Sequence, residues 1–153
     1  MPHDRDSLLA GRNAQPLSEE DQRKATNTFL GLDHNVPVKY EGARTRFRLY
    51  VEDGLEIGEI VFGADIYPGR GVVDPNSSLG MQAAAAHEIT HYYRWRDKTE
   101  LVHADLEEID EALTSLEAIM RFPRNLNDHE NRQLVSDAIQ RLQMYAQRKG
   151  DGV

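Results

Sequence analysis

Apolar side chains recur along this chain with two periods, one of two residues and one of three to four, which mark extended and helical segments. Residues 46–51 alternate charged and apolar side chains, as a half-buried strand does, and Asp53-Gly54 directly afterwards is typical of a tight turn. Strands are therefore expected at 36–40, 45–51 and 56–62, and a further short one at Val72-Val73.

Two helices are expected before and after these strands. Ser18, with Asp21 three residues later, is a capping-box-like start for a helix that runs to about Leu30. A second helix should run from about residue 79 to 95, after capping residues within 74–78.

Two further helices should close the chain. Between 106 and 120 the apolar residues recur at steps of three and four, which predicts an amphipathic helix with Leu113 and Leu116 in the core. A final helix over about 128–148 is expected to turn one apolar side inward, carrying Leu134, Ala138, Leu142 and Tyr145.

This order predicts one α+β domain at residues 16–150, preceded by a mobile tail at residues 1–15. The expected architecture is a small antiparallel sheet with a helix before it and three helices after it. A chain of 153 residues suits a single core of ordinary size.

The sequence His87-Glu88-Ile89-Thr90-His91 is an H-E-x-x-H motif that follows four consecutive alanines. Alanine favours a helix, and a helix places both histidines one turn apart on one face, where each can put a ring nitrogen about 2 Å from one Zn²⁺. Glu88 would lie beside the metal, where a carboxylate can accept a proton from water and return it to a leaving group. Apolar neighbours predict that this helix is buried on most sides, so that the three polar groups need partners.

The motif, a gap of nineteen residues and then Glu111 within Asp110-Glu111-Ala112 resemble the zinc-binding core of the gluzincin metallopeptidases, the family of thermolysin. The resemblance covers about residues 79–122. It implies that His87, His91 and Glu111 bind zinc, that Glu88 is the general base, and that the substrate is a peptide or protein.

One position departs from the family pattern. Thermolysin-like proteins have an aspartate four residues after the glutamate ligand, where it orients a histidine, and this chain has Ser115 there. The groups around the ligands are therefore expected to be arranged differently. We expect Ala112 and Ser115 to lie where this helix contacts the motif helix.

The residues themselves leave the third ligand open. Glu107 and Glu108 lie about one turn before Glu111 on the same helix, and His103 would give a three-histidine site. Regulatory cytoplasmic peptidases that cleave repressors also place a Glu-Ala pair after the motif, at a longer spacing, which keeps a regulatory protease among the hypotheses. The stretch 61–67 is a candidate edge strand for an extended peptide. Candidates for stabilising an oxyanion are Tyr92, Tyr93, His103 and His129.

Composition narrows the class of protein. The chain has no cysteine, which excludes disulfides and thiolate zinc sites. Its first thirty residues contain no stretch that resembles a signal peptide, and no apolar run is long enough to cross a membrane, so we expect a cytoplasmic enzyme. A formal net charge of -8 argues against a nucleic-acid partner.

Two competing hypotheses come from other classes. The metal could be structural or regulatory, in a binding module without turnover, in which case a fourth protein ligand would occupy the position that water takes in a catalytic site. A di-iron helical protein would use the E-x-x-H pairs Glu88/His91 and Glu100/His103, but the strand signals contradict a four-helix bundle.

Overall fold

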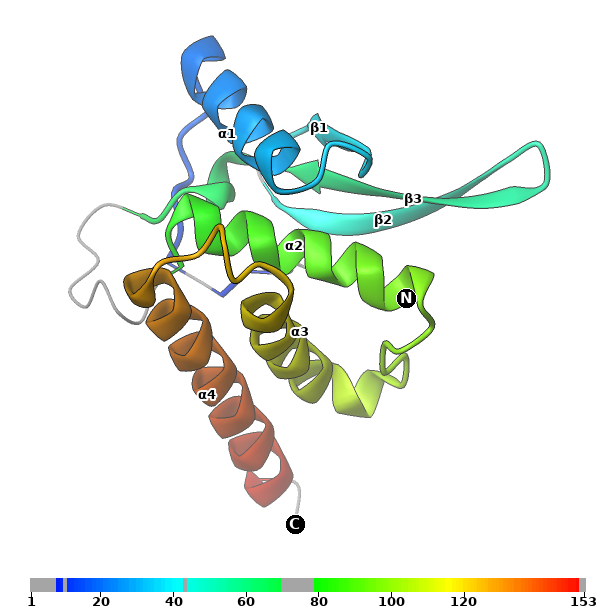
Figure 1. Cartoon of the computed structure of the whole chain (residues 1–153). Helices are drawn as coiled ribbons and strands as arrows, with labels where there is room; N and C mark the ends of the chain where they lie inside the picture. Colours follow the sequence, from blue (N-terminus) through cyan, green and yellow to red (C-terminus); the bar gives the residue numbers. More distant parts are fainter. Residues whose placement is uncertain (1–7, 10, 43, 70–78, 152–153) are drawn as a thin grey trace.

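The computed structural model of this protein describes residues 8–9, 11–42, 44–69 and 79–151 (Figure 1). In these residues, four α-helices and a three-stranded mixed sheet form an α+β fold, which confirms the predicted class. The strand expected at Val72-Val73 and the capping residues expected within 74–78 lie outside the described residues. None of the helices in the described ranges combines the length and apolar character needed to cross a bilayer.

Helix α1 (Glu19–Leu32) begins where the sequence predicts. The side chain of Ser18 accepts a hydrogen bond from the backbone N–H of Asp21 at 3.1 Å, so one of the unpaired donors of the first turn is satisfied. Ala25 and Phe29 are the buried residues of this helix, and they attach α1 to the core.

The sheet has the order β1-β3-β2. Strands β2 (Arg46–Glu52) and β3 (Leu55–Phe62) form the expected antiparallel hairpin, and Asp53 and Gly54 both have positive φ angles, of 52° and 78°. Strand β1 (Val38–Tyr40) pairs parallel with β3, so the prediction of a purely antiparallel sheet was wrong for this pair. The chain crosses from one edge of β3 to the other between β1 and β2.

Because β3 is the central strand, the candidate edge strand at 61–67 is also wrong. Val61 is paired on both sides, with Lys39 of β1 and Arg46 of β2, and Phe62 is paired with Tyr40 of β1. The chain then leaves the sheet through a short 3₁₀ helix, Ala64–Ile66. Within the part of the chain that the structure describes, Val61 therefore offers no open edge to an extended peptide.

Helix α2 (Met81–Arg96) is the centre of the fold. In Figure 1 it lies between the layer of α1 and the sheet on one side and the pair α3 (Glu107–Arg121) and α4 (Asp128–Asp151) on the other, and it contacts all of them. Residues 83–91 are buried without interruption, as expected for a helix surrounded on most sides. The four alanines have no exposed surface, and their small side chains allow neighbouring elements to approach closely.

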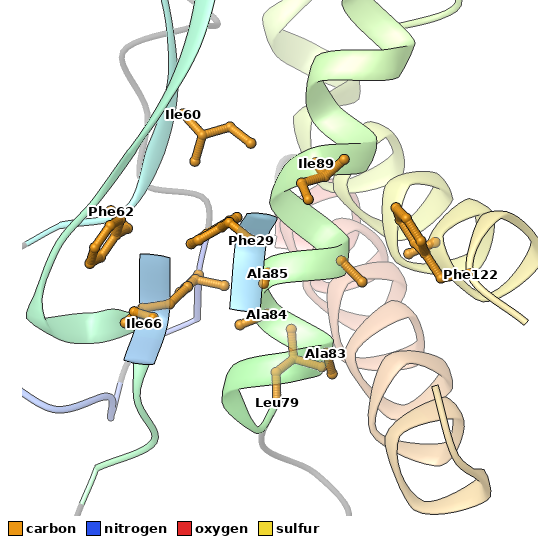
Figure 2. Close-up of a cluster of buried hydrophobic side chains, with 14 of the residues drawn as sticks. Phe29, Ile60, Phe62, Ile66, Leu79, Ala83, Ala84, Ala85, Ile89 and Phe122 are labelled. Atoms are coloured by element: carbon orange, nitrogen blue, oxygen red, sulfur yellow. The ribbon is translucent and has the colours of Figure 1, made fainter. Parts of the chain in front are cut away.

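The apolar core lies mainly between α2 and the sheet. Phe29, Ile60 and Phe62 face the motif helix from α1 and β3, and Phe122 packs from the other side (Figure 2). The rings of Phe29 and Phe62 are stacked with centroids 5.6 Å apart. This packing fixes the helix that carries the H-E-x-x-H motif.

Helix α3 presents a different face to the core from the one that its apolar pattern predicts. Leu113 and Leu116 are 40% and 38% exposed, so their predicted burial was wrong. The buried side of α3 instead consists of small and polar residues, among them Ala112 and Ser115, which do lie against the rest of the fold as expected. Small side chains let this face approach closely, and the polar groups bond to one another across the helices.

Helix α4 is predicted correctly in part. Leu134 and Ala138 are buried, but Leu142 is 44% exposed and Tyr145 is half-buried. Three polar residues share the buried side of α4 with Leu134 and Ala138: Gln133, Asp137 and Arg141.

Part of the segment 1–15 contacts the domain. The guanidinium of Arg12 donates hydrogen bonds to the backbone carbonyls of Asp65, Ile66 and Leu79 at 2.8, 2.9 and 2.6 Å. Leu8 belongs to the hydrophobic core. The mobility of residues 1–15 stays a prediction.

Candidate metal centre

Three side chains from α2 and α3 converge at one buried point. Nε2 of His87 lies 3.1 Å from Nε2 of His91, and Oε1 of Glu111 lies 3.2 Å from the first nitrogen and 3.1 Å from the second. The second oxygen of Glu111 is 2.9 Å from Nε2 of His91. The side chains are 0%, 7% and 2% exposed, in that order, so a single buried cluster contains all three predicted ligands.

The spacing of these three atoms suits a zinc ion. With zinc–ligand distances of about 2.0–2.1 Å, the corners of a tetrahedron are about 3.3–3.4 Å apart. The three separations of 3.1, 3.2 and 3.1 Å are close to that value. A shift of a few tenths of an ångström would make the triangle equal to one face of a tetrahedral site.

Glu88 lies in the same cluster. It is 0% exposed, and it forms with His87 and His91 a group whose potential ligand atoms all lie within 4.8 Å of one another. Two guanidinium groups, those of Arg12 and Arg141, interact electrostatically with its carboxylate. Burial lowers the pKa of Arg12 to about 10, against the opposing effect of Asp65 and other nearby carboxylates, so Arg12 remains a cation at neutral pH.

The contacts shift the pKa values of the three convergent residues. Burial lowers the pKa of His87, because a charged imidazole is poorly solvated there. Burial acts in the same direction on His91, but the carboxylates of Glu111, Glu88 and Asp110 together outweigh it and raise the pKa of His91. Burial would raise the pKa of Glu111, yet the positive charges of His91 and Arg141 hold it well below its usual range. The surroundings therefore favour the ionised carboxylate form of Glu111 beside the two imidazoles.

A second set of polar residues surrounds the ligands. Ser115 Oγ is 2.7 Å from Nδ1 of His87 and donates a hydrogen bond to Asp137 on α4 at 2.6 Å. Arg141, one turn later on α4, contacts both Asp137 at 2.9 Å and Glu111 at 3.3 Å. The altered arrangement expected from Ser115 is thus present, with a carboxylate supplied by another helix.

Asp137 and Arg141 were not identified from the sequence. The available signal was the spacing of Gln133, Asp137 and Arg141 at steps of four, which places three polar residues on the side of α4 that also carries Leu134. A polar stripe on a core-facing side indicates buried hydrogen-bonded groups.

The other candidates for the third ligand lie elsewhere. Glu108 binds the guanidinium of Arg148 at 2.7 and 2.8 Å. His103 is exposed and accepts a hydrogen bond from the N–H of Asp105 at the start of a short 3₁₀ helix. In the described ranges, the groups of three or more potential metal ligands include neither Glu107 nor Glu100, so the pair of E-x-x-H segments does not converge.

Asp110 belongs to a second group of potential ligands, with His91 and Glu111. Its Oδ1 accepts hydrogen bonds from Arg94 at 2.6 Å and from the N–H of Leu101 at 2.8 Å. These bonds tie the start of α3 to the end of α2, which is a structural role.

The candidate oxyanion-stabilising residues make other contacts. The hydroxyl of Tyr93 donates to Asp33 at 2.5 Å, and the ring of Tyr92 packs at the edge of Phe47. His129 pairs with Gln133 at 3.1 Å. Their participation in catalysis stays a prediction.

Comparison of this chain with protein-family models, with curated proteins and with solved structures finds no match, so the buried His87-Glu88-His91 group with Glu111 beside it stands on its own geometry.

Proposed function

We propose that this protein is a zinc-dependent metallopeptidase of the gluzincin type, in which His87, His91 and Glu111 hold the ion and Glu88 is the general base. The observation that supports this most is the near-equilateral triangle of two imidazole nitrogens and one carboxylate oxygen, with sides of 3.1–3.2 Å, buried in the core. Without a cation, so many acceptors in so small a buried volume are costly.

Zinc, when bound, supplies a Lewis acid that polarises a carbonyl and lowers the pKa of water towards 7. Glu88 follows His87 directly on α2, and its carboxylate belongs to the same buried group as the two histidines, so a water bound to the ion would be within its reach. That carboxylate accepts the proton of the attacking water and delivers it to the departing amine. The guanidinium groups of Arg12 and Arg141 interact electrostatically with this carboxylate.

The direct experiment compares the wild-type protein with Glu88→Gln. Both should contain one zinc ion per chain, measured by elemental analysis of the purified proteins. Only the wild type should cleave a mixed peptide library, with the rate of the variant reduced by about 10²–10⁴-fold, the range for the loss of a general base. Full activity in Glu88→Gln, or a wild-type protein that binds no zinc, would contradict this mechanism.

A second candidate is a metal-containing binding or regulatory module without turnover. The observation in its favour is that Glu88 is buried with the two histidines, so that its oxygens could complete a closed, four-ligand site. In that case Glu88→Gln should weaken zinc binding strongly. If Glu88 is a general base and not a ligand, Glu88→Gln should leave the zinc affinity nearly unchanged. A zinc titration of this variant therefore separates the two functions.

A further inference from the structure

A closed ring of polar contacts links the three helices around the candidate ligands. It runs from Nδ1 of His87 to Ser115 at 2.7 Å, to Asp137 at 2.6 Å, to Arg141 at 2.9 Å, to Glu111 at 3.3 Å, and back to Nε2 of His87 at 3.2 Å. All five residues are at most 5% exposed. Helix α4 contributes two members of the ring and no ligand.

The position of each proton in this ring follows from the donors and acceptors. The hydroxyl of Ser115 donates its hydrogen bond to a carboxylate oxygen of Asp137, so it has no second hydrogen to donate to His87. The lone pair of Ser115 then faces His87, whose Nδ1 must carry the ring proton to make a hydrogen bond. A neutral imidazole has one N–H, so Nε2 of His87 is left with a free lone pair.

This lone pair points to the place where the other two ligand atoms meet. Nε2 of His87 and Oε1 of Glu111 lie 3.2 Å apart, a spacing at which both atoms can bind one cation. Arg141 completes the arrangement, because its guanidinium binds the carboxylates of Asp137 and Glu111 together in the core.

We propose that Ser115, Asp137 and Arg141 are positioning residues of the metal centre, which fix the Nδ1–H tautomer of His87 and hold the carboxylate of Glu111 towards the two histidines. The proposal rests on the zinc site described above and deepens it, since it makes α4 a necessary part of a site whose ligands all come from α2 and α3. The three residues act by orienting the ligands, because none of them is itself a candidate ligand.

The tautomer can be tested without metal or substrate. Nitrogen-15 NMR of the imidazole of His87, in the zinc-free full-length chain, should show the proton on Nδ1 in the wild type. In Ser115→Ala the acceptor at Nδ1 is gone while Glu111 still faces Nε2, so the proton should move to Nε2. A wild-type proton on Nε2, or an Nδ1–H form that persists in Ser115→Ala, would overturn the proposal.

Zinc affinity provides the second readout, measured by competition with a chromophoric chelator. Ser115→Ala and Asp137→Ala should each weaken binding by about 10–100-fold, as substitutions of groups that orient ligands do. The double variant should bind zinc about as tightly as the single variant with the lower affinity, because either change alone breaks the same ring. Asp137→Asn, which keeps an acceptor for Ser115, should recover most of the affinity.

The matched control is Thr114→Val. This change also removes a buried hydroxyl from α3, but that hydroxyl donates to the backbone carbonyl of Asp110 on its own helix, at 2.7 Å. Its zinc affinity should equal that of the wild type, and equal affinities in Ser115→Ala and Thr114→Val would refute the positioning role. A wild-type chain that binds no zinc would overturn it as well, whereas a chain that binds zinc in this pattern and cleaves no peptide would overturn only the hydrolase.

Discussion

Replacing Glu111 with Gln tests the third ligand directly. The change keeps the size of the side chain but removes the charge that faces both imidazoles at 3.1–3.2 Å and that also pairs with Arg141. Groups that only orient ligands are worth about 10–100-fold in affinity, so loss of the anionic ligand itself should weaken zinc binding by at least about 100-fold.

The effect on thermal stability follows from mass action. At a free zinc concentration of about 100 times the wild-type Kd, binding stabilises the native state by about 2.7 kcal/mol. For a chain of this size, each kcal/mol shifts the melting temperature by about 2–4 °C, so zinc should raise the wild-type Tm by about 5–11 °C. In Glu111→Gln the same concentration is at most about equal to Kd, and the gain falls to about 0.4 kcal/mol, or about 1–2 °C.

The assay is differential scanning fluorimetry with and without buffered zinc, together with a chelator titration. Glu107→Gln is the matched control, because it removes an acidic side chain from the first turn of α3 and should keep the full zinc-dependent shift. An undiminished shift in Glu111→Gln would remove Glu111 from the site and refute the ligand assignment.

Four other substitutions test the fold that positions the site. Arg12→Lys keeps the charge but loses most of the three hydrogen bonds to backbone carbonyls, so the free energy of unfolding in urea should fall by about 2–4 kcal/mol. A loss below about 0.5 kcal/mol would show that these bonds do not hold the N-terminal segment on the domain. Gly58→Ala would place a Cβ 2.8 Å from two aromatic side chains and should lower the free energy of unfolding by about 1–3 kcal/mol. Gly31→Ala, with open space around it in α1, should raise the free energy of unfolding by about 0.5–1 kcal/mol. Equal effects of the two changes would show that the close contact at Gly58 does not determine the stability. The hydrogen bond from Tyr93 helps to hold the pKa of Asp33 below its usual value, although burial acts in the opposite direction. This stabilisation is present above the pKa that Asp33 has in the unfolded chain, and it is lost as the pH falls through the pKa of Asp33 in the folded protein. The difference in unfolding free energy between wild type and Asp33→Asn, measured by urea titration, should therefore narrow from about pH 7 to about pH 3. A difference that stays constant would contradict the role of this hydrogen bond.

Features with strong local signals were predictable from the sequence. The cap at Ser18 and the turn at Asp53-Gly54 depend on the conformations of a few neighbouring residues. The buried alanine-rich helix follows from helix propensity and from the apolar residues around the motif. The spacing of His87 and His91 is set by one helical turn, so their convergence was also predictable.

Features set by contacts between distant segments were not predictable in the same way. The parallel pairing of β1 with β3 depends on where the chain crosses the sheet, which the pattern of either strand leaves open. Hydrophobic periodicity also misjudged α3, because Glu111 and Ser115 are buried by virtue of partners on other helices. A residue such as Asp137 looks like a surface aspartate until the helix that it faces is known.

The order of the three helices along the chain has a consequence for synthesis. Asp137 and Arg141 lie 26 and 30 residues after Glu111, so all candidate ligands leave the ribosome before the residues that orient them. A nascent chain that carries α2 and α3 alone would hold Ser115 beside His87 without the carboxylate of Asp137, which accepts the hydrogen bond of its hydroxyl. If the proposed zinc site is correct, competence to bind zinc tightly would then arrive only with α4, once the fold that surrounds the site has formed.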